Sequence, residues 1–342
     1  MRYFLGVDIG GSKSHALVAD EEGQAVGFGE AGPGNWEVVG WDGLAATLGT
    51  ITDQALAAAG IGKKQIAAAG YGIAGYDWPS EAEPTRQAIE SLGLDGPYAF
   101  VNDTVVGLLA GASEGWGVAV VAGTSNNCRG RDRQGREGRV TGCGTWFGEG
   151  GGAAEMMAKA VQAVAMEWTR RGPATKLSRS FLELTGASDL ADLLEGLYMG
   201  RYELSASAAP LIFQVAAGGD PVARELICWA GTELGSLAVG VIHQLGFEAL
   251  DPEVVLVGSL YDGSPALIEA MRATIHAVAP RARLVRLTAP PVVGGVLLGM
   301  EQVGLATAGL RERLIATTRK MRRSVQPAGA SGFASPANGQ GG

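Results

Sequence analysis

One local pattern occurs twice in the chain: an apolar strand, a turn of glycine and hydroxyl residues, and a second strand. The first copy spans residues 3–19 around Asp8-Ile9-Gly10-Gly11-Ser12-Lys13. The second copy spans residues 116–131 around Gly123-Thr124-Ser125-Asn126-Asn127. Each copy predicts a β-hairpin. The repeat is one of architecture rather than of sequence, and it predicts two similarly built α/β halves.

The rest of the chain reads as alternating strands and helices. Strands are expected over 25–28, 66–73, 98–101, 139–141, 254–257 and 284–287, and helices over 44–59, 84–92, 104–111, 153–170, 178–184, 190–199, 205–217, 221–245, 265–278, 294–303 and 311–323. We expect domains at 1–112 and 113–323, with the last helix able to pack back on the first domain. The segment 324–342, rich in Gly, Ala, Ser, Pro and Gln, predicts a disordered tail.

Charge and cysteine content exclude little but favour a protein of the reducing cytoplasm. The net charge is −8 and the pI is about 5.1, which argues against a nucleic-acid or anionic-membrane partner. The N-terminus does not resemble a signal peptide, and no uninterrupted apolar run is long enough to span a membrane. The three cysteines form no CxxC pair. We therefore expect free thiols and a cytoplasmic location.

Glycine is in excess, with 54 in 342 residues against an average near 7%. Many of these glycines fall at 10–11, 72–75, 123, 142–152, 258 and 294–299. A glycine backbone can approach a ligand closely because it carries no Cβ atom. We therefore expect these positions to outline a ligand cleft.

The first turn has the composition of an anion cradle. Successive glycine N–H groups can surround a phosphate, while Ser12 adds a hydroxyl donor and Lys13 a positive charge. Asp8 lies at the end of the preceding strand, where its carboxylate is placed to hold Mg²⁺ through a water molecule. An ordinary tight hairpin is the alternative interpretation of this turn taken alone.

Two further turns strengthen the phosphate interpretation. Gly123, Thr124 and Ser125 again follow an apolar strand, and Gly258-Ser259 follows another. Such a set fits a nucleotide held between two domains, with the first two turns at the phosphates and the third at the adenosine. The chain has neither a P-loop motif nor a G-x-G-x-x-G opening near its N-terminus.

These segments, taken in order, resemble the N-acetylglucosamine kinase and BadF/BadG/BcrA/BcrD ATPase family, within the superfamily of actin, hexokinase and the heat-shock chaperone ATPases. The residues that carry the resemblance are the turn at 8–13, Gly34-Asn35-Trp36, Gly72-Ile73-Ala74-Gly75, Asn102-Asp103, residues 122–129, Gly142-Cys143-Gly144-Thr145-Trp146 and Gly258-Ser259. They extend over about residues 1–305. The resemblance implies two actin-like, ribonuclease H-like domains with a nucleotide and sugar cleft between them. It also implies ATP and Mg²⁺ as cofactors, an amino-sugar substrate and a homodimer.

Asp103 is the candidate catalytic base. Phosphoryl transfer to a hydroxyl needs a group that accepts the hydroxyl proton, and Asp103 follows a strand at the edge where open α/β sheets bind ligands. An aspartate before a helix is also a common N-cap, so spacing alone leaves both roles open. The resemblance places the family's base at this position.

The resemblance further implies a set of sugar contacts: Asn35, Trp36, Gly75, Asn102, Asn127, Gly144, Thr145, Trp146 and Glu149. Thr145 stands where the family has a second glycine, and Glu149 stands where it has an aspartate. The first departure changes the freedom of the backbone, and the second bears on sugar specificity. Asn35 could instead be a turn residue, Trp146 a core residue, and the glycines of 148–152 a flexible linker.

The predicted function is an ATP-dependent amino-sugar kinase that phosphorylates the 6-hydroxyl of N-acetylglucosamine. Glucosamine, N-acetylmuramic acid and other hexoses are neighbouring substrates. One rival is a [4Fe–4S] ATPase activator of a 2-hydroxyacyl-CoA dehydratase, with Cys128 and Cys143 as cluster ligands. Another is a non-catalytic sugar sensor, against which the presence of Asp103 and both phosphate turns argues.

Overall fold

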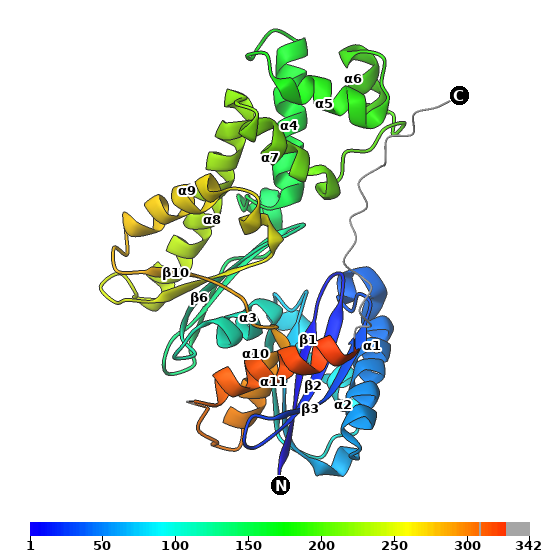
Figure 1. The fold of residues 1–342 in the computed structure, drawn as a ribbon, viewed down its shortest axis with the longest axis vertical. Helices are drawn as coiled ribbons and strands as arrows, with labels where there is room; N and C mark the ends of the chain where they lie inside the picture. Colours follow the sequence, from blue (N-terminus) through cyan, green and yellow to red (C-terminus); the bar gives the residue numbers. More distant parts are fainter. Residues whose placement is uncertain (308, 326–342) are drawn as a thin grey trace.

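The computed structural model describes residues 1–307 and 309–325. Their fold consists of two five-stranded sheets with surrounding helices (Figure 1). The predicted α/β class is confirmed. The expected tail begins within the last helix, and its residues from 326 onward lie outside the described part of the chain.

The first sheet has the strand order β3-β2-β1-β4-β5. Its strands are β1 (Tyr3–Ile9), β2 (Ser14–Asp20), β3 (Ala25–Ala31), β4 (Ile66–Ile73) and β5 (Tyr98–Asn102). Strands β1, β4 and β5 are parallel, while β2 and β3 continue the sheet antiparallel. Asp8 lies opposite Gly72, and Ile73 lies opposite Asn102. The residues that follow these three parallel strands therefore share one edge of the sheet.

The second sheet repeats this arrangement with the order β10-β9-β6-β7-β8. Its strands are β6 (Gly117–Ala122), β7 (Asn126–Arg131), β8 (Glu137–Arg139), β9 (Glu253–Val257) and β10 (Arg283–Arg286). Strands β6, β9 and β10 are parallel, and Val121 lies opposite Val257. The turns that follow β6 and β9 are therefore neighbours.

The strand predicted over 139–141 is β8, which ends at Arg139. Asp132 closes the preceding turn tightly, because its Oδ1 accepts hydrogen bonds from the backbone N–H groups of Gln134 and Arg136 at 2.9 and 2.8 Å. A strand can therefore begin already at Glu137.

The N-terminal part of the first half also contains the helices α1 (Trp36–Ala59), α2 (Ala82–Glu90) and α3 (Asp103–Gly111). The prediction that the first helix begins at residue 44 is wrong. Gly40, at φ 72°, interrupts the helix and so breaks the apolar period on which the prediction depended. Asn35 caps the true start by accepting a hydrogen bond from the N–H of Glu37 at 3.0 Å.

The second half contains the helices α4 (Ala153–Trp168), α5 (Lys176–Thr185), α6 (Leu190–Tyr198), α7 (Pro210–Ala217), α8 (Pro221–Leu245) and α9 (Pro265–His276). Within the described residues, five 3-10 turns lie at η1 (Lys63–Gln65), η2 (Pro79–Glu81), η3 (Gly144–Phe147), η4 (Ala206–Ala208) and η5 (Ser259–Asp262). The single helix predicted over 205–217 is wrong: Pro210, which lacks a backbone N–H, starts α7 as a separate helix after η4.

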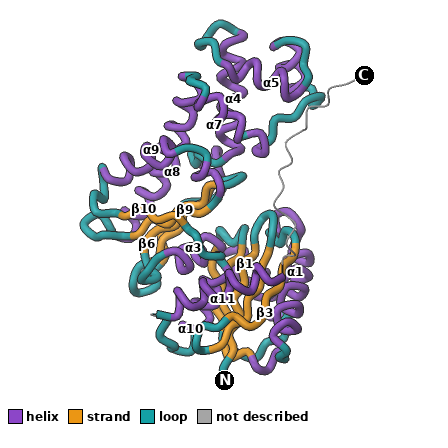
Figure 2. The backbone as a smooth tube through the Cα atoms, in the orientation of Figure 1, coloured by secondary structure: helices purple, strands orange, loops and turns teal. Residues whose placement is uncertain are grey.

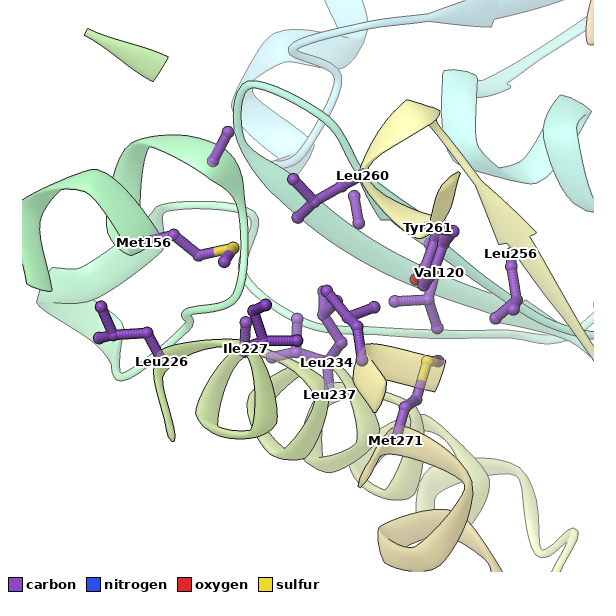
Figure 3. Close-up of a cluster of buried hydrophobic side chains, with 14 of the residues drawn as sticks. Val120, Met156, Leu226, Ile227, Leu234, Leu237, Leu256, Leu260, Tyr261 and Met271 are labelled. Atoms are coloured by element: carbon purple, nitrogen blue, oxygen red, sulfur yellow. The ribbon is translucent and has the colours of Figure 1, made fainter. Parts of the chain in front are cut away.

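Helix α8 packs over the second sheet and against α9, and side chains of both helices and of the sheet form the core in Figure 3. Leu234 and Leu237 of α8, Val120 and Leu256 of the sheet and Met271 of α9 belong to this one buried cluster. By length and hydropathy alone, α8 could span a membrane, but 56% of its most apolar window is buried within the protein. This burial identifies α8 as a core helix.

The first half is completed by the end of the chain. Helices α10 (Val292–Glu301) and α11 (Leu310–Val325) lie beside the first sheet (Figure 2). Core residues of α10 and α11 pack with Phe4 and Leu17 of β1 and β2. Helix α3 contacts both sheets and so lies at the junction of the two halves.

The glycines of α10 serve this packing and not a ligand. A Cβ atom on Gly294 would lie 1.9 Å from the carbonyl oxygen of Val106 in α3, and one on Gly295 would lie 2.8 Å from the N atom of Val7 in β1. The expectation that 294–299 outlines the ligand cleft is therefore wrong: these residues let a helix lie directly on a sheet.

Candidate active site

The first phosphate turn is exposed at the edge where β1 ends. Gly11, Ser12 and Lys13 are open to solvent, and a Cβ atom on Gly11 would meet no atom within 4 Å. A Cβ atom on Gly10 would lie 2.5 Å from the carbonyl oxygen of Lys13, so the turn is tight at that point. Its outer surface can thus receive an anion.

Asp8 lies at the end of β1 beside this turn, with a side chain 14% exposed. Its Oδ2 is 3.9 Å from Nδ1 of His15, which faces it across the β1–β2 pair. Lys13 Nζ is 3.9 Å from Glu30 Oε1. This exposed pair is weak in water, so the lysine can turn to another anion.

Three of the predicted sugar contacts, Asn35, Trp36 and Gly75, meet at the start of α1. The indole N–H of Trp36 donates a hydrogen bond to the carbonyl of Gly75 at 2.7 Å. A Cβ atom on Gly75, at φ +80°, would lie 2.4 Å from Oδ1 of Asn35. Asn35 also donates to Glu37 Oε2 at 3.0 Å. The structure therefore brings these three residues together and gives Asn35 a capping role as well.

Asp103 is the first residue of α3, and it is not the N-cap. Asn102 fills that place, since its Oδ1 accepts a hydrogen bond from the N–H of Thr104 at 3.0 Å. Burial, followed by the charges of Asp8 and Asp77, raises the pKa of Asp103 to about 7, against the opposing effects of the Thr104 N–H and of Arg129. A carboxylate with such a pKa is poised to accept a proton near neutral pH.

Asp77 is a site residue that the sequence did not reveal. It lies in the turn after β4, and its Oδ1 accepts hydrogen bonds at 3.3 Å from the side-chain amides of Asn102 and Asn127. It also pairs with the guanidinium of Arg129. Asn102 belongs to the first half and Asn127 and Arg129 to β7 of the second, so Asp77 connects the two sides of the site. No local pattern around Asp77 could have indicated this.

Glu149 braces the loop that carries the other predicted sugar contacts. The carboxylate is buried, and its Oε1 accepts hydrogen bonds from the N–H and the hydroxyl of Thr141 at 2.6 and 2.7 Å. Its Oε2 accepts from the N–H of Gly144 at 3.3 Å. We refer to residues 141–149 as the sugar loop, after the contacts that the sequence predicts for it.

The tip of the sugar loop is strongly exposed. Trp146 is 95% exposed and Phe147 is 60% exposed, while Thr145 is also open to solvent. The alternative that Trp146 is a core residue is therefore wrong. Gly144 and Gly148 flank this tip with φ values of +71° and +75°, so both are in the left-handed region that favours glycine.

The turns of the second half that are predicted to bind the nucleotide open into a pocket of about 860 Å³. Gly123, Thr124 and Ser259 line it together with residues from α4, η4 and α7. Gly258 packs against β6, where a Cβ atom would lie 2.2 Å from the carbonyl oxygen of Ala122. Ser125 is adjacent to Gly123, whose N–H donates to the Ser125 carbonyl at 3.0 Å. The second and third predicted turns thus share one cavity.

Sequence reasoning missed the far wall of this pocket. Ser205, Ser207, Phe213 and Gln214 line it, but their segment reads from the sequence only as a packing helix. The backbone of Gly263 lies on the ring of Phe213, to which a Cβ atom would come within 2.8 Å. Small residues, serine hydroxyls and one aromatic ring make a wall suited to a planar base.

The carboxylates at the site can hold Mg²⁺ only if phosphate groups supply further oxygen ligands. Among the described residues, no group of three or more His, Cys, Asp or Glu side chains could hold a metal ion. Mg²⁺ commonly keeps several waters and is bound by one or two carboxylates plus substrate phosphates. Asp8, at the end of β1 beside the phosphate turn, matches this mode.

Two halves of the same topology, with glycine turns at facing strand ends, define the actin-like ATPase fold. The sequence profile of the BadF/BadG/BcrA/BcrD ATPase family matches residues 5–299. The chain belongs to this family, which confirms the resemblance seen in the sequence.

Two curated relatives match nearly the whole chain. The N-acetylmuramic acid/N-acetylglucosamine kinase of Clostridium acetobutylicum is 24% identical over 305 residues, which are 88% of this chain and 99% of the relative. The N-acetyl-D-glucosamine kinase of Dictyostelium discoideum is 25% identical over 315 residues, which are 87% of this chain and 97% of the relative.

Solved structures show the same fold. A candidate N-acetylglucosamine kinase from Chromobacterium violaceum has a TM-score of 0.63 at 22% identity, with 87% of this chain and 99% of that chain covered. A ROK family glucokinase from Streptomyces griseus, crystallised with glucose and AMPPNP, has a TM-score of 0.53 at 21% identity, with the same coverage.

Proposed function

We propose that the protein is an ATP-dependent amino-sugar kinase that transfers the γ-phosphoryl group of ATP to the 6-hydroxyl of N-acetylglucosamine. The observation that carries the proposal is the place of Asp103, a carboxylate with a pKa raised to about 7 at the junction of two glycine-turn halves. The names of the two curated relatives support the amino-sugar class.

Asp103 accepts the proton of the sugar hydroxyl as the hydroxyl oxygen forms its bond to the γ-phosphorus. The bond from that phosphorus to the bridging oxygen breaks, and ADP leaves with the electron pair. Gly10, Gly11, Ser12 and Lys13 bind the phosphates from one side. Mg²⁺, when bound near Asp8, supplies neutralisation of the phosphate charge.

The second half binds the rest of the nucleotide. Gly123, Thr124 and Ser125 contact phosphate, and Gly258 and Ser259 contact adenosine. The pocket of about 860 Å³ that these turns border supports this assignment, because it is large enough for a purine nucleoside.

The sugar lies between Asp103 and the sugar loop. Asn35, Asn102 and Asn127 offer both donors and acceptors to its hydroxyl groups. Gly144, Thr145 and Trp146 approach the N-acyl group, together with Trp36 and Gly75 on the opposite side. Glu149 acts here through the loop that it braces, and its free hydrogen-bonding capacity is directed to a sugar hydroxyl.

A coupled ADP-release assay tests the proposal. We expect ATP turnover to depend on N-acetylglucosamine and to be lost in D103N. N-Acetylmuramic acid, glucosamine and glucose should be compared in the same assay, because one relative is named for two amino sugars. Absence of turnover with every sugar, or full activity of D103N, would refute the proposal.

The dehydratase-activator alternative finds less support. Cys128 is buried in β7, and burial raises the pKa of its thiol, whereas Cys143 is exposed on the sugar loop. A cluster bridging two subunits needs accessible thiolates from each chain. Iron analysis of protein purified without oxygen should find no iron.

We further propose a cytoplasmic homodimer. All three cysteines are free thiols, which suits a reducing compartment. Large apolar residues are exposed where helices α4 and α6 of the second half end: Trp168 is 53%, Tyr198 88% and Met199 65% exposed. Size-exclusion chromatography with light scattering should give twice the chain mass, and Y198S should shift it toward the monomer.

A further inference from the structure

The ion pair between Asp77 and Arg129 is buried between the two halves. The side chain of Arg129 is 3% exposed and that of Asp77 is 12% exposed. The Nε atom of Arg129 is buried without a hydrogen-bond partner. Because removal of one member of such a pair leaves an uncompensated charge, each residue depends strongly on the other.

Asp77 is tied to the proposed base through Asn102. The Asn102 side chain accepts the N–H of Thr104 with its oxygen and donates to Asp77 with its nitrogen. It therefore links the Asp77 carboxylate directly to the first turn of α3, where Asp103 lies. A shift of Asp77 would pass to the N-terminus of that helix.

Asp77 is tied equally to the sugar side. Asn127 donates to Asp77 with its nitrogen, and its oxygen accepts the N–H of Cys128 at 2.8 Å, so the amide has a fixed orientation. A Cβ atom on Gly142 would lie 2.7 Å from Oδ1 of Asp77. The sugar loop therefore begins in contact with the same carboxylate.

We propose that Asp77 and Arg129 are positioning residues that hold Asn102 and the adjoining Asp103 in alignment with Asn127 and the sugar loop across the cleft. This inference rests on the proposed function, because the groups that are aligned are the proposed base and sugar contacts. Loss of the pair should impair use of the sugar and leave ATP binding nearly unchanged, since the nucleotide pocket is lined by other residues.

The test compares D77N, R129M and the double variant with R131M as a matched control. Arg131 lies on the same strand and also reaches the other half, where it pairs with Glu301 of α10 at 2.8 Å. Values of kcat and KM are measured for N-acetylglucosamine and for ATP with the full chain. R129K should recover part of the loss in R129M, because it restores the charge without the planar fork.

We expect D77N and R129M each to lower kcat/KM for the sugar by about 100-fold, the loss that a misplacement of about 1 Å can cause. The KM for ATP should stay within about threefold of wild type. The double variant should lose no more than the worse single variant, since the two residues act as one unit. Losses below about threefold, or an equal effect of R131M, would overturn the inference.

Hydrogen exchange of the free protein gives a readout that needs no substrate. In D77N and R129M, the amides of residues 102–104 and 141–149 should exchange faster than in wild type, and in R131M they should not. Unchanged exchange there would overturn the inference even in an active kinase. If wild type shows no sugar-dependent turnover but exchange responds as expected, the proposed function fails and the positioning role stands. Should D77N not fold, R129K and R129M carry both measurements.

Discussion

Glu149 accepts two hydrogen bonds from one residue, Thr141, at 2.6 Å from its N–H and 2.7 Å from its hydroxyl. This pair closes the sugar loop at its base, while Trp146 at its tip stays 95% exposed. The loop therefore combines a fixed base with an aromatic tip that has few contacts of its own. Such a segment is suited to moving onto a ligand.

Shortening Glu149 by one methylene should weaken the base of the loop. In E149D we expect KM for the sugar to rise about tenfold, because a carboxylate moved back by about 1.5 Å cannot keep its contacts with both Thr141 and Gly144. The KM for ATP should not change. Steady-state kinetics with each substrate varied in turn measure both values, and an unchanged KM for the sugar would contradict the expectation.

The pH dependence of activity should follow Asp103. As a base it must be deprotonated, and its pKa is raised to about 7. We therefore expect kcat/KM for the sugar to be constant above pH 8 and to fall about tenfold per pH unit well below 7. A profile that remains flat down to pH 5 would show that another group takes the proton.

The same group should make the fold less stable as the pH rises. A carboxyl whose pKa is raised from 3.8 to about 7 on folding binds its proton more tightly in the folded state. Stability is then lost as the pH increases from about 4 to about 7. D103N removes this loss, so its Tm should exceed that of wild type by a few degrees at pH 8. At pH 4, where wild-type Asp103 is protonated when folded, the two Tm values should converge.

The ring of Phe213 should contribute to nucleotide affinity. It lines the pocket of about 860 Å³ and lies against the backbone of Gly263. We expect F213A to raise KM for ATP about tenfold, as one lost aromatic contact of about 1–1.5 kcal/mol would, with KM for the sugar unchanged. Equal changes in both KM values would indicate a general loss of structure instead.

Two glycine-to-alanine changes should have opposite effects on stability. In G294A the new methyl group would lie 1.9 Å from the carbonyl oxygen of Val106, so we expect a loss of about 1–3 kcal/mol. In G240A, within α8, the methyl group meets no atom within 4 Å, and we expect a gain of about 0.5–1 kcal/mol. Chemical denaturation measures both, and a stable G294A would show that α10 can move away from α3.

Much of the fold could be predicted because its signals are local. Strand alternation and the glycine turns located both sheets, and the ordered motifs identified the family. The start of the first helix was predicted too late because Gly40 interrupts its apolar period. The segments η4 and α7 were predicted as one helix because the helical pattern continues across Pro210. Turn and cap geometry, rather than composition, decided these boundaries.

The candidate site was predicted only where a residue lies in a recognisable turn. Asp103, Asn35 and the turns at 8–13 and 123–127 became candidates in this way. Asp77 and Arg129 could not, because their pairing joins the turn after β4 to strand β7 of the other sheet and leaves no trace in spacing. The wall formed by Ser205 to Gln214 was missed for the same reason, since its segment faces the nucleotide turns only after the second half has folded.

The packing of α10 and α11 on the first sheet has a consequence for biosynthesis. Phe4 and Leu17 are fully buried against Val292, Val296 and Leu314, so this face of the sheet stays uncovered while the intervening residues are being made. The second half is continuous in sequence and can fold on the ribosome before the first is complete. The apolar face of the first-made strands therefore stays open until the last helices emerge, and a truncation that removes α10 and α11 would expose the oldest part of the chain rather than the newest.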